Sequence, residues 1–275
     1  MKGRGNVPDW LSEWLDQLSA GGLALVICGS FIAVTWLGIL VVHPVMRRIL
    51  HRKQPSNELV IHIAGSFGLI YAVLLDLLTV ATFQNTKDLQ DDIGREASSL
   101  STIYHSADGY PEPLRSEVKA ELRDYTHYII DKDWPAHRRG IVPMGGEHRL
   151  KVIRSTLMSF EPATKTQEML HSELLRYLDS MMVSREQRLA TVTAAIPRVL
   201  WYVVVIGALL TIAFLWMLHM ELMPQIMLGG VTAFFLGIMI FLIYAMDHPL
   251  RGAVSVPPDA FRSVYDLVMK WDEPA

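Results

Sequence analysis

The chain has 275 residues, of which 51% are hydrophobic and only 19% are charged, and its mean hydropathy is +0.26. A chain this apolar can bury more surface than ordering costs, which excludes disorder, and a single cysteine with 18 glycines excludes a disulfide framework and collagen. The net charge of −3 provides no basic field for nucleic acid. These averages favour an integral membrane protein whose main partner is the lipid bilayer.

The apolar residues are concentrated in four stretches, each of at least 20 residues. A helix rises about 1.5 Å per residue and has to cross roughly 30 Å of hydrocarbon, so each stretch is long enough to span. We expect an all-α, multi-pass protein of the cell (inner) membrane with two plus two transmembrane helices. The expected spans are residues 23–45, 59–83, 199–218 and 226–246.

Residues 84–197, between the second and third spans, are predicted to form a helical extramembrane domain. Its first apolar stripe continues in phase with the second span, which predicts one helix from about residue 59 to about residue 107. Turn residues at Asp108-Gly109 and at Pro135 separate the helices that follow. Apolar positions three and four apart include Leu89, Ile93, Leu100, Val118, Leu122, Tyr125, Leu150, Ile153, Leu157, Leu174 and Leu178.

Amphipathic segments flank the spans at both ends of the chain, in residues 1–22 and 247–275. Trp10 and Trp14 lie on the apolar face of the first segment, and Phe261 and Trp271 on that of the second. Tryptophan on such a face suits the headgroup layer of a bilayer, but either face also suits packing on the helical domain. The sequence leaves both alternatives open.

The orientation in the membrane follows from the positive charges. The short loop between the first two spans holds Arg47, Arg48, Arg52 and Lys53, whereas the loop between the last two has no Lys or Arg. The positive-inside rule therefore places the helical domain outside the cytoplasm. Opposing this prediction are six cations close to the membrane on the domain side, namely Lys87, Arg95, Arg185, Arg188, Arg198 and Arg251.

A set of different short motifs is spread over nearly the whole chain. They are Arg95-Glu96-Ala97-Ser98-Ser99-Leu100, Tyr104, Leu114-Arg115, Tyr125, Asp133-Trp134-Pro135, Arg185, Arg188-Leu189, Pro197, Trp201, Asp247-His248-Pro249-Leu250-Arg251-Gly252, Pro258 and Phe261. In order and spacing this set resembles the bestrophin-like membrane proteins grouped as the DUF4239 domain. The resemblance implies an oligomeric membrane protein related in layout to the bestrophin anion channels. The chain departs from the pattern at Asp76, where such proteins usually have glycine.

A stripe with polar members runs the length of the second span. At 100° per residue its members fall close to one line, and in hydrocarbon an ionised Asp76 costs at least ~2.5 kcal/mol. Asp76 therefore has to face protein, water or a partner charge. Either the stripe lines a pore between subunits, or Asp76 hydrogen-bonds within its own subunit to Thr35, Thr211, Tyr202 or Tyr244. The stripe consists of His62, Ser66, Leu69, Val73, Asp76, Val80 and Gln84.

The end of the fourth span combines opposite charges with a proline. Pro249 is expected to stop the helix, and Asp247 and Arg251 are expected to form an ion pair that sets the exit geometry, a structural role.

Motifs for metal binding and catalysis are lacking in the sequence. Asp124, His127 and Asp131 share a helical face, but there is no HExxH and no CxxC, so we expect a solvated face without a metal. The domain's charges are mixed in sign, which indicates ordinary solvation. Without a GxSxG motif or a glycine-rich phosphate loop, we expect neither an enzyme nor a cofactor.

The functional hypothesis from the sequence is an oligomeric ion channel, a tetramer or pentamer of this chain. Copies of the second span surround the pore, and its extension beyond the membrane builds a vestibule. A ring of Asp76 carboxylates favours inorganic cations, whereas the bestrophin resemblance implies anions. The alternative from another class is a non-conducting membrane scaffold or sensor that binds a partner through the helical domain.

Overall fold

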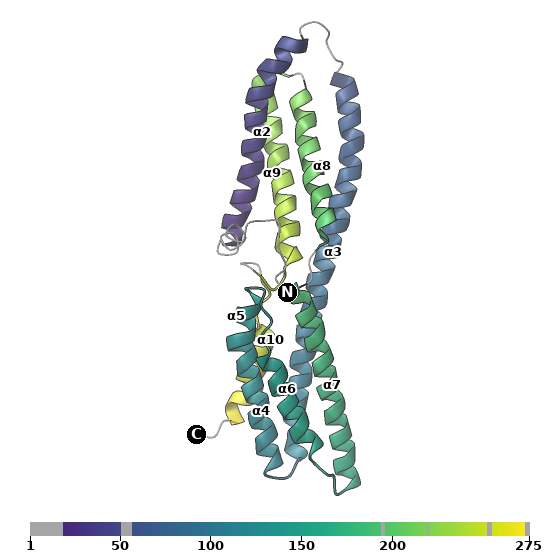
Figure 1. Ribbon diagram of the computed structural model, residues 1–275, viewed down its shortest axis with the longest axis vertical. Coiled ribbons are helices and arrows are strands. Elements are labelled where there is room, and N and C mark those ends of the chain that lie inside the picture. Colours follow the sequence, from purple (N-terminus) through teal and green to yellow (C-terminus); the bar gives the residue numbers. More distant parts are fainter. Residues whose placement is uncertain (1–18, 51–56, 194–195, 219, 252–254, 273–275) are drawn as a thin grey trace. The chain divides into compact units, whose positions relative to one another are not determined.

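The computed structural model describes residues 19–50, 57–193, 196–218, 220–251 and 255–272, and the elements assigned in these ranges are all helical (Figure 1). The chain divides into two compact units. One comprises Met1–Asn85 and Ala195–Asp247, and the other comprises Thr86–Ala194 and His248–Ala275. The predicted all-α class is confirmed. The N-terminal face around Trp10 and Trp14 lies outside the described residues.

Within the described residues, four helices are long and apolar enough to cross a membrane, as predicted. One begins four residues earlier than predicted, at Leu222, because Pro224 falls in its first turn, where a missing N–H group leaves no hydrogen bond unmade. The four helices are α2 (Ala20–Leu50), α3 (Asn57–Ser106), α8 (Arg198–Met217) and α9 (Leu222–Asp247).

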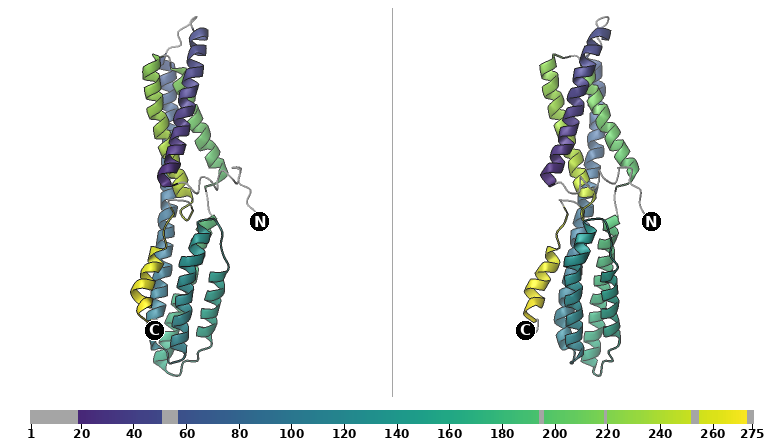
Figure 2. Two further views of the ribbon diagram at one scale, coloured as in Figure 1. Left: turned by 90° about the vertical axis from the view of Figure 1, so that its left-hand side faces the viewer. Right: turned by 60° about the vertical axis from the view of Figure 1, so that its left-hand side comes forward.

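In the first unit, α2 lies along α9 over most of its length (Figure 2). The two backbones approach closely at Gly237, where an added Cβ would lie 2.7 Å from the Cα of Cys28. Only a residue without a side chain allows this approach. Near the other end of the pair, the Trp36 indole N–H donates to the carbonyl oxygen of Ile226 at 3.2 Å, which adds a polar contact to the packing.

One face of α3 packs against α8 in the same unit. Gly207 of α8 leaves room for the ring of Tyr71, and the Tyr71 hydroxyl donates to the Val204 carbonyl at 2.7 Å. A buried hydrogen bond of this kind satisfies the one polar group of an otherwise apolar contact. The buried cluster comprises Tyr71, Leu75, Leu78, Val204, Ala208, Ile212, Leu236, Ile240 and Ile243.

The second unit is a bundle built on the remaining part of α3. Near Pro135, where the sequence predicted a helix end, three short helices follow one another without a gap, and Pro135 lies in the first turn of the last of them, a position that tolerates proline. The helices are α4 (Leu114–Tyr128), η2 (Ile129–Asp133), α5 (Trp134–His137), α6 (Gly145–Met158), α7 (Lys165–Thr193), α10 (Asp259–Val264), η3 (Tyr265–Met269) and η4 (Lys270–Asp272), with η1 (Ala107–Gly109) after α3.

The predicted apolar stripes meet in the core of this bundle. Leu89, Leu100, Val118, Leu122 and Ile153 are among its fully buried members. The C-terminal segment covers the same core: Phe261 and Met269 are fully buried, whereas Trp271 is 83% exposed. Of the two alternatives for this segment, the structure shows packing on the helical domain.

Candidate functional site

The stripe predicted on the second span lies on α3, and all seven of its residues are exposed on the isolated chain. Leu69 is 70% exposed, Val73 53% and Val80 58%, and Asp76 lies among them in the exposed class. These apolar side chains can face lipid, but the Asp76 carboxylate cannot.

The face of α3 that packs on α8 lies on the opposite side of the helix. Tyr71, Leu75 and Leu78, which form it, are each at most 7% exposed. Spacings of three and four residues place them about half a helical turn away from Leu69, Val73 and Val80. In the part of the chain that the structure describes, folding therefore covers one side of α3 and leaves the stripe side open.

The carboxylate of Asp76 makes no hydrogen bond to any part of the chain that the structure describes. Two of the hydroxyl groups predicted as alternatives are used within their own helices: Thr35 donates to the Phe31 carbonyl at 2.8 Å and Thr211 to the Gly207 carbonyl at 2.9 Å. The alternative in which these two residues bind Asp76 inside the subunit is therefore wrong. Among the described residues, Asp76 therefore has no hydrogen-bond partner.

At the end of α9, Asp247 binds the start of α8 within the same unit. Its Oδ1 accepts the backbone N–H of Ile196 at 2.6 Å, and its Oδ2 accepts the indole N–H of Trp201 at 3.3 Å. A carboxylate at this place satisfies a backbone donor near the first turn of a helix. Asp247 thus makes structural contacts, but with Ile196 and Trp201 and not with the predicted partner Arg251.

Arg251 makes its contacts within the second unit and not with Asp247. The predicted Asp247–Arg251 ion pair is therefore wrong. Nη2 of Arg251 donates to the Val192 carbonyl at 2.9 Å, and the guanidinium lies over Gly140, whose φ of +70° favours glycine. Pro249 follows the last residue of α9 by two positions, as expected of a helix stop, and its carbonyl accepts the N–H of Val256 at 2.8 Å.

The core of the helical domain contains a bidentate ion pair between α3 and α7. Nε and Nη2 of Arg188 donate to the two carboxylate oxygens of Glu96 at 2.7 and 3.1 Å, and both side chains are fully buried. Tyr125 of α4 donates its hydroxyl proton to the same carboxylate at 2.7 Å. The Arg188 guanidinium also lies 5.1 Å from the Trp134 ring and 5.7 Å from the Phe261 ring.

A second buried pair adjoins the first. Nη1 of Arg185 donates to Oδ2 of Asp133 at 3.0 Å, with both side chains nearly inaccessible. Burial raises the pKa of Asp133, and the adjacent Arg185 offsets part of this effect. The two pairs bring two carboxylates and two guanidinium groups together without net charge, which is the condition under which charges are tolerated in a core.

His137 completes this polar core as a neutral side chain. Its Nδ1 lies 3.3 Å from Nη1 of Arg188, and because arginine can only donate, Nδ1 accepts. Burial and then the charge of Arg188 lower the pKa of His137 to about 3. The ring therefore carries its proton on Nε2 throughout the neutral pH range.

The sequence interpretation missed this polar core, because it assigned the domain's mixed charges to the surface. Glu96 lies on the same helical face as Ile93 and Leu100, and Arg185 and Arg188 continue the stripe of Leu178. The sequence did contain a signal for buried pairs. One apolar stripe has a charged residue at a core position, and another stripe has the opposite charge at a core position.

The face proposed as solvated on α4 uses its charges in surface contacts. Asp124 accepts from Nε of Arg149 at 2.7 Å, and His127 lies 4.0 Å from Asp131. Within the described residues no group of three His, Cys, Asp or Glu side chains is placed to hold a metal.

These features define a helical membrane protein with four spans, in which a long second helix enters a domain held by buried ion pairs. Comparison with known proteins agrees. A family model described as the bestrophin-like domain matches residues 29–261, and the chain belongs to this bestrophin-like family. No curated protein matches the sequence.

Solved structures of bacterial bestrophin homologues from Klebsiella pneumoniae share the fold. One, solved by Zn-SAD phasing, has a TM-score of 0.67 at 14% identity and covers 89% of this chain and 98% of its own. Two others, each carrying a mutation, have TM-scores of 0.68 and 0.66, and both are 13% identical and cover 88% of this chain and 98% of their own. At such identity the similarity shows the fold.

Breaking the buried pair is predicted to be far more damaging than breaking a surface pair on the same helix. Arg188→Met leaves Glu96 buried without its cation, which should lower the free energy of unfolding by about 3–5 kcal/mol. Arg176→Met removes an exposed pair with Glu173 and should change it by no more than about 1 kcal/mol. Unfolding midpoints of both purified variants measure the difference, and equal shifts would show that the pair contributes no more than a surface contact.

The neutral state of His137 predicts a loss of stability in acid. Unfolding raises the pKa of His137 from about 3 to the ordinary 6.5, so below pH 6.5 the unfolded state binds a proton that the folded state does not. The free energy of unfolding therefore decreases as the pH falls below 6.5. The slope should approach about 1.4 kcal/mol per pH unit. Unfolding midpoints between pH 7 and about 5 should fall less in His137→Gln than in the wild type. His105→Gln, at an exposed position of α3, is the control and should follow the wild type.

Proposed function

We propose that this protein is an oligomeric ion channel, a tetramer or pentamer, in which α3 of each copy lines the pore and cations are favoured. The observation that carries the proposal is Asp76: a carboxylate that is exposed on a membrane-spanning helix, on the side that the chain itself leaves uncovered. Water in a pore between copies provides the polar surroundings that this group needs. Family membership and fold support a channel in general.

The stripe supplies the parts that a selective pore requires. Copies of Asp76 around an axis form a ring of carboxylates that attracts cations. Leu69, Val73 and Val80, which are exposed on the same side, narrow such a pore with apolar side chains. His62 and Gln84 are the outermost polar members of the stripe. The side of α3 that packs on α8 anchors the lining helix to its own subunit.

The same helix continues beyond the spans with an exposed side. Lys87, Asp91, Ser98 and His105 are exposed, whereas Leu89, Ile93 and Leu100 are buried in the domain core. The exposed polar residues support the vestibule expected outside the membrane, since ions need a hydrated approach to a carboxylate ring.

Replacing the carboxylate should change selectivity. Purified wild-type protein in a planar bilayer with a KCl gradient should give a reversal potential on the cation side. Asp76→Asn removes the ring charge and should reduce the cation-to-anion permeability ratio several-fold. Asp259→Asn removes an exposed carboxylate on α10 and should leave the ratio unchanged. Currents whose selectivity is the same with and without Asp76, or selective for anions in the wild type, would contradict the carboxylate ring.

The charge of the first loop supports an extracytoplasmic helical domain, in the inner membrane of a cell that has two. Cys28 is the only cysteine, so Cys28→Ser gives a background for labelling. Ser172→Cys, at an exposed position of α7, should then react with a membrane-impermeant maleimide on cells whose inner membrane is intact. Reaction only after permeabilising that membrane would place the domain in the cytoplasm.

A further inference from the structure

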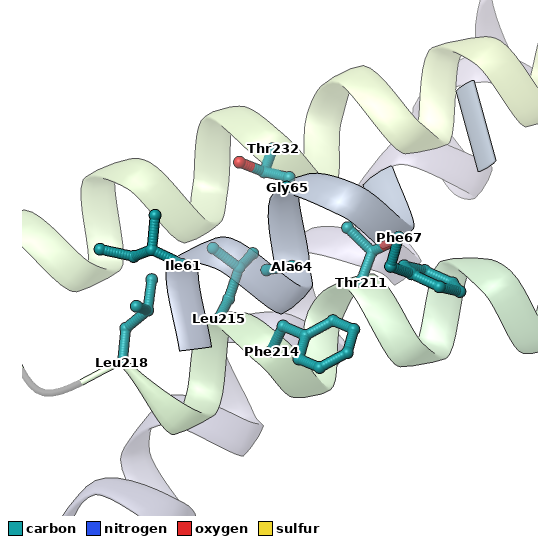
Figure 3. Close-up of a pocket in the computed structure, with 9 residues that line it drawn as sticks. All are labelled: Ile61, Ala64, Gly65, Phe67, Thr211, Phe214, Leu215, Leu218 and Thr232. Atoms are coloured by element: carbon teal, nitrogen blue, oxygen red, sulfur yellow. The ribbon is translucent and has the colours of Figure 1, made fainter. Parts of the chain in front are cut away.

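A cavity of about 320 Å³ lies between α3, α8 and α9 in the membrane-spanning unit (Figure 3). Its wall on α3 includes Ile61, Gly65 and Phe67, and its wall on α8 includes Phe214 and Leu215. The rings of Phe67 and Phe214 lie 5.6 Å apart at one end of the cavity. The lining side chains carry no charge, so the site suits an apolar ligand.

This cavity is unfavourable both for water and as an empty space. The wall has two hydroxyl groups, on Thr211 and Thr232, and that of Thr211 already donates to the Gly207 carbonyl of its own helix. Water needs about two to four polar partners, and this wall offers few. An empty space would forfeit the dispersion contacts of the atoms that line it. The loop between the first two spans, residues 51–56, reads His-Arg-Lys-Gln-Pro-Ser and does not match an apolar wall.

The cavity opens onto the exposed surface of the membrane-spanning unit. Ile61 is 57% exposed while it lines the cavity, and Gly65 is exposed as well. The apolar lining is therefore continuous with exposed apolar surface at Ile61, through which a hydrocarbon chain of a surrounding bilayer could reach the cavity.

We propose that this cavity binds one acyl chain of a membrane lipid between α3 and α8. The acyl chain fills the space between these ends of α3 and α8, where side chains of the protein leave a cavity. Gly65 lies between His62 and Ser66 in sequence, so the bound chain contacts the turn of α3 that carries the first residues of the stripe. An influence of the lipid on conduction rests on the proposed channel function, whereas the binding itself does not.

Site-specific crosslinking tests the occupant. A photoreactive diazirine side chain replaces Leu215 in the full chain, which is placed in nanodiscs of phosphatidylcholine and illuminated. Mass spectrometry should find a phosphatidylcholine adduct at position 215. Gly65→Phe puts a ring into the cavity, and because an added Cβ at Gly65 meets nothing within 4 Å, the backbone need not move. This variant should reduce the adduct several-fold.

Two controls separate the cavity from the general lipid surface. Gly29→Phe on α2 makes the same change at an equally open, exposed position and should leave the adduct unchanged. The diazirine at Leu210, on α8 but outside the cavity, should react equally with and without Gly65→Phe. Gly65→Leu replaces Gly65→Phe if the larger ring prevents folding.

An adduct to a peptide of a second copy, or a lipid adduct at position 215 that Gly65→Phe does not reduce, would overturn the proposal. The crosslink is read without any current measurement. A failure of lipid binding is thus distinguishable from a failure of the channel function.

Discussion

One constraint governs how this chain uses its second helix: no ionised side chain is stable against hydrocarbon, so each side of α3 has to match a different surrounding. The side with Tyr71 and Leu75 is covered by α8. The side with Asp76 is exposed and cannot be left to lipid. A single copy satisfies only the first requirement, and the second calls for water or further copies of the chain. The proposed assembly around a water-filled pore meets this second requirement.

The buried ion pairs of the domain show a different solution to the same problem. Glu96 and Arg188 are removed from water, but the bidentate geometry and the Tyr125 hydroxyl replace the lost hydration. Apolar residues of similar volume would stabilise a core as well or better. A bidentate contact has a defined geometry, and here it joins α3 to α7 at one pair of positions.

The sequence predicted the elements whose signal is periodic and long. The four spans and the stripes of Leu122 and Leu178 follow from hydropathy and from spacings of three and four, which depend only on neighbours along the chain. Partners across the fold were harder to predict. The Asp247–Arg251 pair was expected from proximity in sequence, but Asp247 instead accepts the backbone N–H of Ile196, two residues before α8 begins. Tertiary contacts such as this one, like the burial of Glu96, depend on which stripes face each other, and local spacing does not contain that information.

The two parts of α3 are held by the chain in different ways. In the domain, Glu96 and the apolar residues around it are fully buried among α4, α7 and the C-terminal segment. Near its start, the helix borders a cavity, and Gly65 there has no neighbour within 4 Å of an added Cβ. Dense packing resists displacement, whereas a helix end that borders an apolar cavity has fewer side-chain contacts that hold its position. The first turns of α3, which carry His62 and Ser66, are therefore the part of the proposed pore lining most open to influence from the surrounding lipid.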